Sequence, residues 1–359
     1  MFLRDLDLEK IVDRYELTMD RQNHDRPALY LMFPDGKAKN VPPPPKSLYE
    51  RWFGFERQID SFERNLEATG FLCEGFPAYG MCNLGPDVLA GFMGSQLEFA
   101  EGTSWAHFRV DDWSKEPPLR FHRESALWQA MEQYLKLCAE RGKGKWLVGS
   151  GDLHSNADGL AALRGPERLL MDLIDQPAEI HKRLKECHEV FLQVAQAHFD
   201  ILHPLSGGFN TSWIPVVGRG RYAVIQNDFC CMVGPAMFDE FFKEYVELEA
   251  ASVERAIYHL DGAGAIPHVP SICASPHLEA IQWVPGAGKP PSCEWPELLT
   301  QIQGLGKGLW LNPANLAEAE KLMRVLKPEG CLYCMWCGSR SEAEEYIKLT
   351  ETVYHCKIK

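Results

Sequence analysis

The chain has 359 residues, 45% of them hydrophobic and 24% charged, a composition typical of a globular protein long enough to bury a large core. Its formal net charge of -13 argues against nucleic acid or an anionic membrane surface as the main partner. No apolar stretch reaches the about 18 residues that a membrane span needs, and acidic residues interrupt the apolar N-terminus, so we expect neither a membrane span nor a signal peptide.

The first part of the chain predicts two helical segments around one strand. Residues 1–25 read as a polar amphipathic helix, and residues 26–33 (RPALYLMF) as a short apolar strand. The proline run at 41–47 is too short to separate two domains and predicts an extended surface loop. Residues 47–68 carry apolar side chains at helical spacing. We therefore expect residues 1–69 to form an N-terminal helical extension with the first strand.

From residue 70 onward, short apolar runs alternate with longer helical patterns. The apolar runs are 70–80, 145–155, 207–216, 222–232, 255–264, 279–288, 308–315 and 331–339. The helical patterns are 123–141, 165–200, 235–256, 294–304, 315–327 and 341–354. Such alternation predicts an α/β fold with a mainly parallel sheet. Eight runs favour a closed (β/α)8 TIM barrel over residues 70–359. An open doubly wound sheet is the alternative, weakened because no G-x-G-x-x-G follows the first strand.

Polar and aromatic residues stand at the ends of these runs, where a barrel of this kind has its active site. We predict that the side chains contacting a small-molecule substrate include Tyr79, Asp152, His154, Asn210 and Trp283. A purely structural role for Asp152 and His154 is an open alternative. Asp228, in the run 222–232, is a candidate catalytic acid.

The segment YHLDGAG (258–264) is a candidate metal site. His259 and Asp261 are two residues apart, so on an extended strand they project to the same side. An imidazole nitrogen and a carboxylate on one face can share a metal ion. The alternative is a core histidine hydrogen-bonded to an aspartate.

The segment CLYCMWCGS (331–339) carries three evenly spaced cysteines. On a strand, Cys331 and Cys337 share one side and Cys334 faces the other, and no glycine or proline precedes Gly338 to turn the chain. We therefore favour one or two functional thiols at the strand's end, with Cys337 at an exposed tip, over a three-cysteine cluster. The twelve cysteines overall fit reduced thiols in the cytoplasm better than a disulfide scaffold.

Two of these passages together resemble a known superfamily. A strand ending in His-x-Asp, followed much later by a strand ending in Cys-Gly, is similar to the uroporphyrinogen decarboxylase superfamily, and most similar to its cobalamin-dependent methyltransferase branch. Residues 165–184 and 226–245 also resemble that superfamily, and the resemblance covers roughly residues 70–355.

The resemblance implies a metal site of His259, Asp261 and Cys337. Asp261 stands where that branch has a cysteine, so the ligand set would be harder and would hold zinc or another divalent metal. The resemblance also implies a (β/α)8 barrel and a metal-dependent methyltransferase that moves a methyl group between a small molecule or thiol and a corrinoid. The corrinoid would come from a partner protein. The segment GDLHSNADG nearly matches a corrinoid-binding motif, but Ala157 occupies its glycine position and no domain is left to hold the cofactor.

Two other functions remain open. One is a metal-assisted decarboxylase or lyase with Asp228 or Asp261 as proton donor. Uroporphyrinogen itself is excluded as its substrate, because no arginine follows the first strand until Arg51. The other is a non-catalytic metal-binding protein. A homodimer is compatible with the sequence, which does not name the methyl donor or acceptor.

Overall fold

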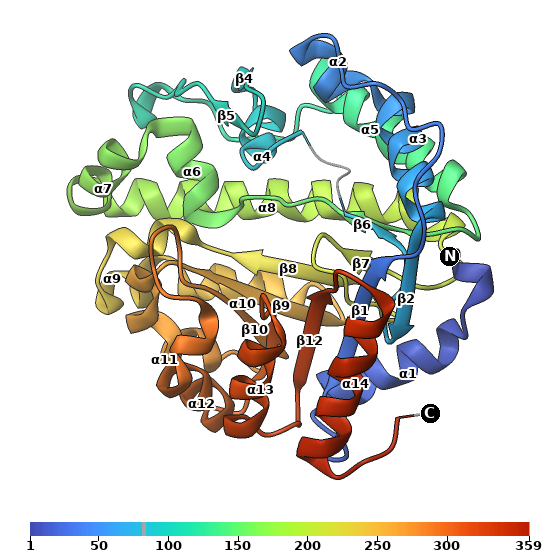
Figure 1. Cartoon of the computed structure of the whole chain (residues 1–359). Coiled ribbons are helices and arrows are strands. Elements are labelled where there is room, and N and C mark those ends of the chain that lie inside the picture. The colour runs from blue at the N-terminus through green and yellow to red at the C-terminus, as the bar shows by residue number, and fades with distance from the viewer. Residues whose placement is uncertain (81–83, 359) are drawn as a thin grey trace.

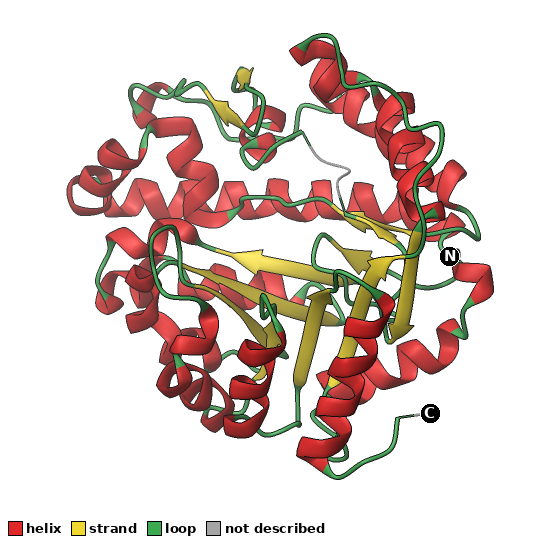
Figure 2. Ribbon diagram, viewed as in Figure 1, coloured by secondary structure: helices red, strands yellow, loops and turns green. Residues whose placement is uncertain are grey.

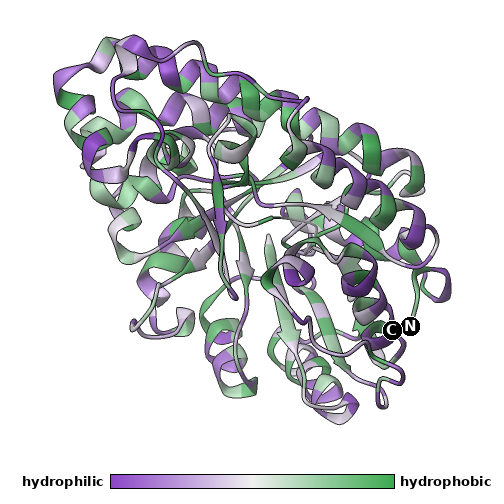
Figure 3. Cartoon of the chain, turned by 90° about the horizontal axis from the view of Figure 1, so that it is seen from above, coloured by the Kyte–Doolittle hydropathy of each residue, from purple (hydrophilic) through white to green (hydrophobic). Residues whose placement is uncertain are grey.

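The structure is a computed structural model, and it describes residues 1–80 and 84–358 (Figure 1). Its centre is a mostly parallel β-sheet, and helices surround it (Figure 2). The predicted α/β class is confirmed. Helices around the sheet carry both hydrophilic and hydrophobic residues (Figure 3), as amphipathic helices on a buried sheet do. Among the described residues, no helix combines the length and the apolar character that crossing a membrane requires.

The main sheet has seven strands. Their order is β2 (Thr69–Cys73), β1 (Ala28–Pro34), β12 (Cys331–Trp336), β11 (Gly308–Leu311), β10 (Ala280–Val284), β9 (Arg255–Asp261) and β8 (Tyr222–Gln226). Neighbours from β1 through β12 to β8 are parallel, and only β2 runs antiparallel to β1.

Two smaller sheets complete the strands. One has the order β3 (Ala78–Tyr79), β6 (Leu147–Ser150) and β7 (Thr211–Ser212), all parallel. The other is an antiparallel pair of β4 (Leu97–Phe99) and β5 (Ser104–Ala106). Strand β7 lies next to β8 at one edge of the main sheet.

The predicted closed barrel is not confirmed, because the main sheet does not close on itself among the described residues. At one edge, β2 occupies the side of β1 that β3 would need. At the other edge, the residue before β7 pairs within its own loop: Asn210 and Gly218 exchange backbone hydrogen bonds of 2.9 and 3.1 Å. Strands of two residues offer little backbone to bridge either gap.

The helices follow the strands along the chain. They are α1 (Leu8–Met19), α2 (Leu48–Phe53), α3 (Phe55–Glu67), α4 (Val88–Phe92), α5 (Ala126–Gly142), α6 (Asn156–Arg164), α7 (Pro166–Asp175), α8 (Pro177–Leu202), α9 (Pro235–Phe241), α10 (Lys243–Ala251), α11 (Val269–Cys273), α12 (Pro296–Gly304), α13 (Leu316–Val325) and α14 (Arg340–Tyr354). Short 3-10 turns lie at η1 (Leu3–Asp5), η2 (Trp113–Lys115), η3 (His203–Leu205), η4 (Asp228–Met232), η5 (Ala263–His268) and η6 (Ser292–Glu294).

The N-terminal segment is part of the sheet rather than a separate layer. Strand β1 pairs with β12 on one side and with β2 on the other, so the predicted boundary at residue 69 falls at the first residue of β2, within a hydrogen-bonded pair of strands. A buried ion pair fixes this edge, since Arg26 contacts both carboxylate oxygens of Glu74 at 2.7 and 2.9 Å. Glu74 also accepts the backbone N–H of Leu29 at 2.8 Å.

Candidate active site

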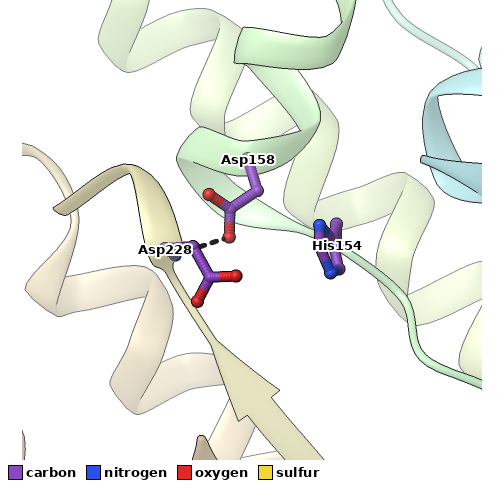
Figure 4. Close-up of side chains that lie close together, drawn as sticks. All are labelled: His154, Asp158 and Asp228. Carbon is purple, nitrogen blue, oxygen red and sulfur yellow. Dashed lines mark hydrogen bonds between the residues drawn. The ribbon is translucent and has the colours of Figure 1, made fainter. Parts of the chain in front are cut away.

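The loops after β6 and β8 and the end of β9 meet at one cluster of acidic and imidazole side chains. Ligand atoms of His154, Asp158 and Asp228 all lie within 4.8 Å of one another (Figure 4). The same holds for Asp228, His259 and Asp261, so Asp228 belongs to both groups. The site therefore sits at the C-terminal ends of the strands, as the sequence predicted for a parallel sheet.

Asp158 fixes the backbone that carries Asp228. It lies in the first turn of α6, and its carboxylate accepts the backbone N–H of Asp228 at 2.9 Å and that of Phe229 at 2.7 Å. These two amides begin the 3-10 turn η4, so the buried carboxylate caps this turn and sets the direction of the Asp228 side chain (Figure 4).

The start of α6 is held by an unusual backbone conformation. Asn156 has a φ of 55°, in the left-handed region that asparagine tolerates better than most residues. Its side-chain amide donates to the carbonyl of Phe242 at 3.2 Å. This sharp turn lets the chain bring both His154 and Asp158 to the same cluster.

His154 forms an ion pair at the edge of the cluster. Its Nε2 lies 3.1 Å from Oδ2 of Asp152. Burial lowers the pKa of His154, but the hydrogen bond and the negative charges of Asp152, Asp158 and Asp228 outweigh burial and raise that pKa to about 9. His154 is therefore protonated at neutral pH and has no lone pair to offer a metal.

Asp228 has an unusual carboxyl group. Burial raises its pKa, the charge of Asp158 raises it further, and the nearby His259 and His154 oppose the shift, which leaves the pKa at about 7. A carboxyl group with a pKa near neutrality can donate or accept a proton in catalysis. When a cation binds beside it, the same group is ionised and becomes a ligand.

His259 is oriented by a neighbour on the next strand. Its Nδ1 lies 2.6 Å from the side-chain oxygen of Gln282, which places the hydrogen on Nδ1 and leaves the lone pair of Nε2 for a ligand. The ring of Trp213 packs edge-on against His259 at 5.3 Å. His259 and Asp261 project to the same side of β9, as predicted, because a ligand atom of each lies within 4.8 Å of the other and of Asp228.

Several buried acceptors of the cluster lack a hydrogen bond within the described part of the chain. They include Oδ1 of Asp152, of Asp228 and of Asp261. A buried acceptor without a donor costs free energy, which a cation or a substrate donor would recover. One imidazole nitrogen with carboxylate oxygens is a donor set for zinc or a similar divalent ion. The residues Asp228, His259 and Asp261 therefore fit a metal.

The structure does not bring Cys337 to this group. Its backbone N–H donates to the carbonyl of Met32 at 2.7 Å, and its side chain lines a separate cavity of about 290 Å³. Burial, with the charge of Glu342 in α14, raises the pKa of Cys337 to about 12. The expectation that Cys337 forms an exposed tip was wrong, because it is 5% exposed while Trp336 beside it is 72% exposed.

The three cysteines of β12 also fail to converge. Cys334 lines the cavity at the mouth of the sheet, whereas Cys337, just beyond the end of β12, lines the neighbouring smaller cavity. The Cys331 thiol donates to the carbonyl of Lys327 at 3.1 Å. The candidate metal groups among the described residues contain no cysteine, so the alternative of a thiol cluster finds no support there.

The mouth cavity of about 560 Å³ lies beside the acidic cluster. Much of its lining is aromatic, from Tyr30, Phe62, Phe71, Tyr79, Trp213, Trp310 and Trp336. Its polar lining includes Asp152, Ser212, Asn312 and Cys334. Asp152 and Trp213 connect this cavity to the cluster, since each also contacts one of its histidines. A rim cavity of about 400 Å³ shares Asp152 and carries Arg51 and Arg57.

The five predicted substrate residues lie in different parts of the structure. Tyr79 and Asp152 line the mouth cavity, and His154 lies in the cluster. Asn210 instead holds its own loop, donating to the carbonyl of Gly220 at 3.0 Å. Trp283 packs against Trp295 near the start of α12 with ring centroids 5.4 Å apart, so Gln282 rather than Trp283 faces His259.

Comparison with known proteins adds a fold relationship. No family model matches the chain, and no curated protein sequence matches it. A solved structure, a methyltransferase from Methanosarcina mazei, is similar in fold. The match has a TM-score of 0.51 and 13% sequence identity, and covers 75% of this chain and 77% of that one. At this identity, the similarity establishes a shared fold.

Sequence reasoning missed two residues of the site. Asp158 lies between the run 145–155 and the helical pattern 165–200, in a stretch assigned to neither, and its contact with η4 depends on the packing of α6. Gln282 stands at a strand end beside Trp283 but was not chosen as a site residue, although its position opposite His259 in the register of β9 and β10 follows from strand pairing. The alternation of side chains along a strand was the signal for Gln282.

Proposed function

We propose that this chain is a metal-dependent methyltransferase. It would move a methyl group between a small molecule or thiol in the mouth cavity and a corrinoid on a partner protein. One observation carries the proposal: Asp228, His259 and Asp261 converge beside an aromatic cavity, on a fold similar to that of a methyltransferase. The identity of the methyl donor remains open within this proposal.

The proposed metal ligands are His259, Asp261 and Asp228. Asp228 takes the role of third ligand, which was predicted from the sequence for Cys337. A divalent cation bound there would supply Lewis-acid activation of a thiol or of a leaving group. Gln282 holds the His259 ring so that Nε2 faces the group. His154, kept protonated by Asp152, places a positive charge and a hydrogen-bond donor beside the carboxylates.

The aromatic lining supports an uncharged or cationic methyl-bearing substrate. Trp213, Trp310 and Trp336 offer ring faces and edges to an apolar group, and a methylated cation would gain cation–π attraction. We propose that the corrinoid comes from a partner, because Asp152 and His154 of the near-motif are already paired with each other at the mouth.

The arrangement of the strands supports a barrel-like wall with two open seams. Reading β3, β6 and β7, and then β8 through β12 to β1, gives a series of nine strands, one more than a (β/α)8 barrel has, with a break where the two sheets meet. Strand β7 lies next to β8, and the hydroxyl of Tyr30 on β1 donates to the carbonyl of Phe76 beside β3 at 2.7 Å. We propose that the chain is a (β/α)8-type barrel interrupted at these two seams.

The test is an anaerobic methyl-transfer assay. Metal-loaded protein is incubated with methylcobalamin and a panel of thiols, or with cob(I)alamin and methylated amines, while the corrinoid spectrum is recorded. We expect a spectral change in the wild type and in Cys337→Ser, and its loss in Asp261→Asn. No change with any donor or acceptor, in protein that binds metal, would overturn the proposal.

A metal-assisted decarboxylase or lyase is the second candidate. The observation that favours it is the Asp228 carboxyl, whose burial, together with the charge of Asp158, raises its pKa to about 7 and suits it to protonate a carbanion. Release of carbon dioxide from small carboxylic acids without any corrinoid, abolished in Asp228→Asn, would favour this reaction. Turnover that strictly needs a corrinoid would exclude it.

A further inference from the structure

A second cavity, of about 390 Å³, lies between helix α8 and the seam where β7 and β8 fail to pair. Helix α8 runs alongside this part of the sheet (Figure 1). Its side chains Phe191, Ala195 and His198 line the cavity, with Tyr222 and Val224 of β8 opposite. Its volume falls within the roughly 300–1,000 Å³ of small-molecule sites.

His198 is the unusual feature of this cavity. It is 1% exposed, and neither of its ring nitrogens has a hydrogen-bond partner within residues 1–80 and 84–358. Burial lowers the pKa of His198 to about 4, so the ring is neutral and carries one N–H donor and one acceptor. The ring stacks on Trp128 at 5.8 Å with an interplanar angle of 19°, which fixes its orientation.

The remaining lining carries no unpaired charge. Arg221 is the only lining residue with a formal charge at neutral pH within the described chain, and it forms an ion pair with Glu254 at 3.1 Å. The other lining residues are mostly aliphatic or aromatic, with a few hydroxyl and amide groups. A charged ligand would therefore lose its hydration without gaining a counter-charge.

We propose that this cavity is a binding site for a neutral, mainly apolar small molecule with one hydroxyl group, of the phenol class, which hydrogen-bonds to His198. The apolar walls would take the ring, and a hydroxyl can both donate and accept, so it satisfies either nitrogen of the imidazole. The site lies behind the mouth cavity, with which it shares Ser212, and it does not depend on the proposed methyl transfer.

The test compares two ligands and three proteins. By calorimetry, 4-bromophenol should bind the wild type more tightly than bromobenzene, which lacks the hydroxyl. In His198→Phe, affinity for 4-bromophenol should fall by about tenfold while affinity for bromobenzene changes little, because one net hydrogen bond is lost. Glu189→Gln, on an exposed position of α8, is the matched control and should leave both affinities unchanged.

The location is checked by anomalous diffraction from crystals soaked in 4-bromophenol. The bromine peak should lie between α8 and β8, and Ala195→Phe, which fills the cavity, should remove it. Equal affinity of the wild type for both ligands would overturn the proposal. So would a bromine peak elsewhere, or ordered water alone in the cavity. If His198→Phe fails to fold, the wild-type ligand pair and Ala195→Phe still decide the question.

Discussion

At the scale of single residues, the cluster depends on side chains whose neighbours come from other loops. Asp228 would be an ordinary exposed acid on an isolated strand end. In the fold, Asp158, Asp261 and His259 surround it, and burial removes the water that would stabilise its charge. The chemistry of Asp228 is therefore set by contacts that its own segment does not encode.

Gln282 should control how tightly the site holds a metal. Gln282→Leu removes the acceptor for Nδ1–H of His259, so the ring loses its fixed tautomer and orientation. We expect metal affinity to fall by about 10–100-fold, as for other residues that orient a metal-binding histidine. Competition with a chromophoric chelator measures this. Asn312→Leu, which alters the mouth cavity without touching His259, should keep its affinity, and equal losses in both would contradict the assignment.

Glu249 should make stability depend on pH. It is 1% exposed, Nδ1 of His188 lies 3.9 Å from its Oε1, and burial raises its pKa. A raised carboxyl pKa costs the folded state nothing below the ordinary glutamate value of about 4.3. As the pH rises above that value the unfolded state ionises first, so the cost grows and is complete once the pH has passed the raised value.

Glu249→Gln should therefore increase the free energy of unfolding at neutral pH by about 1–3 kcal/mol, the cost of an unpaired buried group. The gain should vanish in acid, where the wild-type glutamate is protonated in both states. Denaturant titrations at the two pH values decide this. A destabilised variant at neutral pH would mean that the His188 contact outweighs burial.

At the scale of secondary structure, the carboxylate of Asp158 in α6 caps the turn η4 and so joins the loop after β6 to the loop after β8. Asp158→Ala leaves the buried amides of Asp228 and Phe229 without an acceptor, and should lower the free energy of unfolding by about 1–3 kcal/mol. Asp158→Asn keeps one acceptor oxygen and should lose less. Urea denaturation compares them, and equal losses would show that the cap contributes nothing specific.

The sequence predicted most elements because hydrophobic periodicity reports which face of an element is buried. The helical patterns at 294–304, 315–327 and 341–354 correspond to α12, α13 and α14. The pattern at 47–68 splits at Gly54, where a Cβ would lie 2.3 Å from the carbonyl oxygen of Glu50. Periodicity did not reveal this break, because the apolar spacing continues across it.

For the strand Cys331–Trp336, the sequence did not predict which cysteine lines the mouth cavity. Alternation predicted opposite sides for Cys334 and Cys337, but β12 ends at Trp336, and alternation could not say which cysteine lines the mouth cavity. That depends on which neighbour the strand pairs with and where α14 packs. The resemblance to a family with a C-terminal ligand cysteine favoured Cys337, and the packing places Cys334 in the mouth cavity instead.

At the scale of the whole molecule, the site assembles from strands of two different sheets. His154 follows β6 of the three-stranded sheet, while Asp228 follows β8 of the main sheet and His259 lies in β9 of that sheet. The sequence predicted the common edge at which they meet, because parallel strands place their C-terminal ends together. It did not predict the two seams, which depend on the antiparallel β2 and on the pairing of Asn210 within its own loop.

The central claim is that Asp228, His259 and Asp261 together hold one divalent metal, and that Cys337 does not. The direct measurement is elemental analysis of protein purified without added metal, for the wild type, Asp228→Asn, His259→Gln, Asp261→Asn and the matched control Cys337→Ser. The account predicts one metal per chain in the wild type and in Cys337→Ser, and its loss in the other three variants. Metal lost from Cys337→Ser but retained in Asp228→Asn would contradict it.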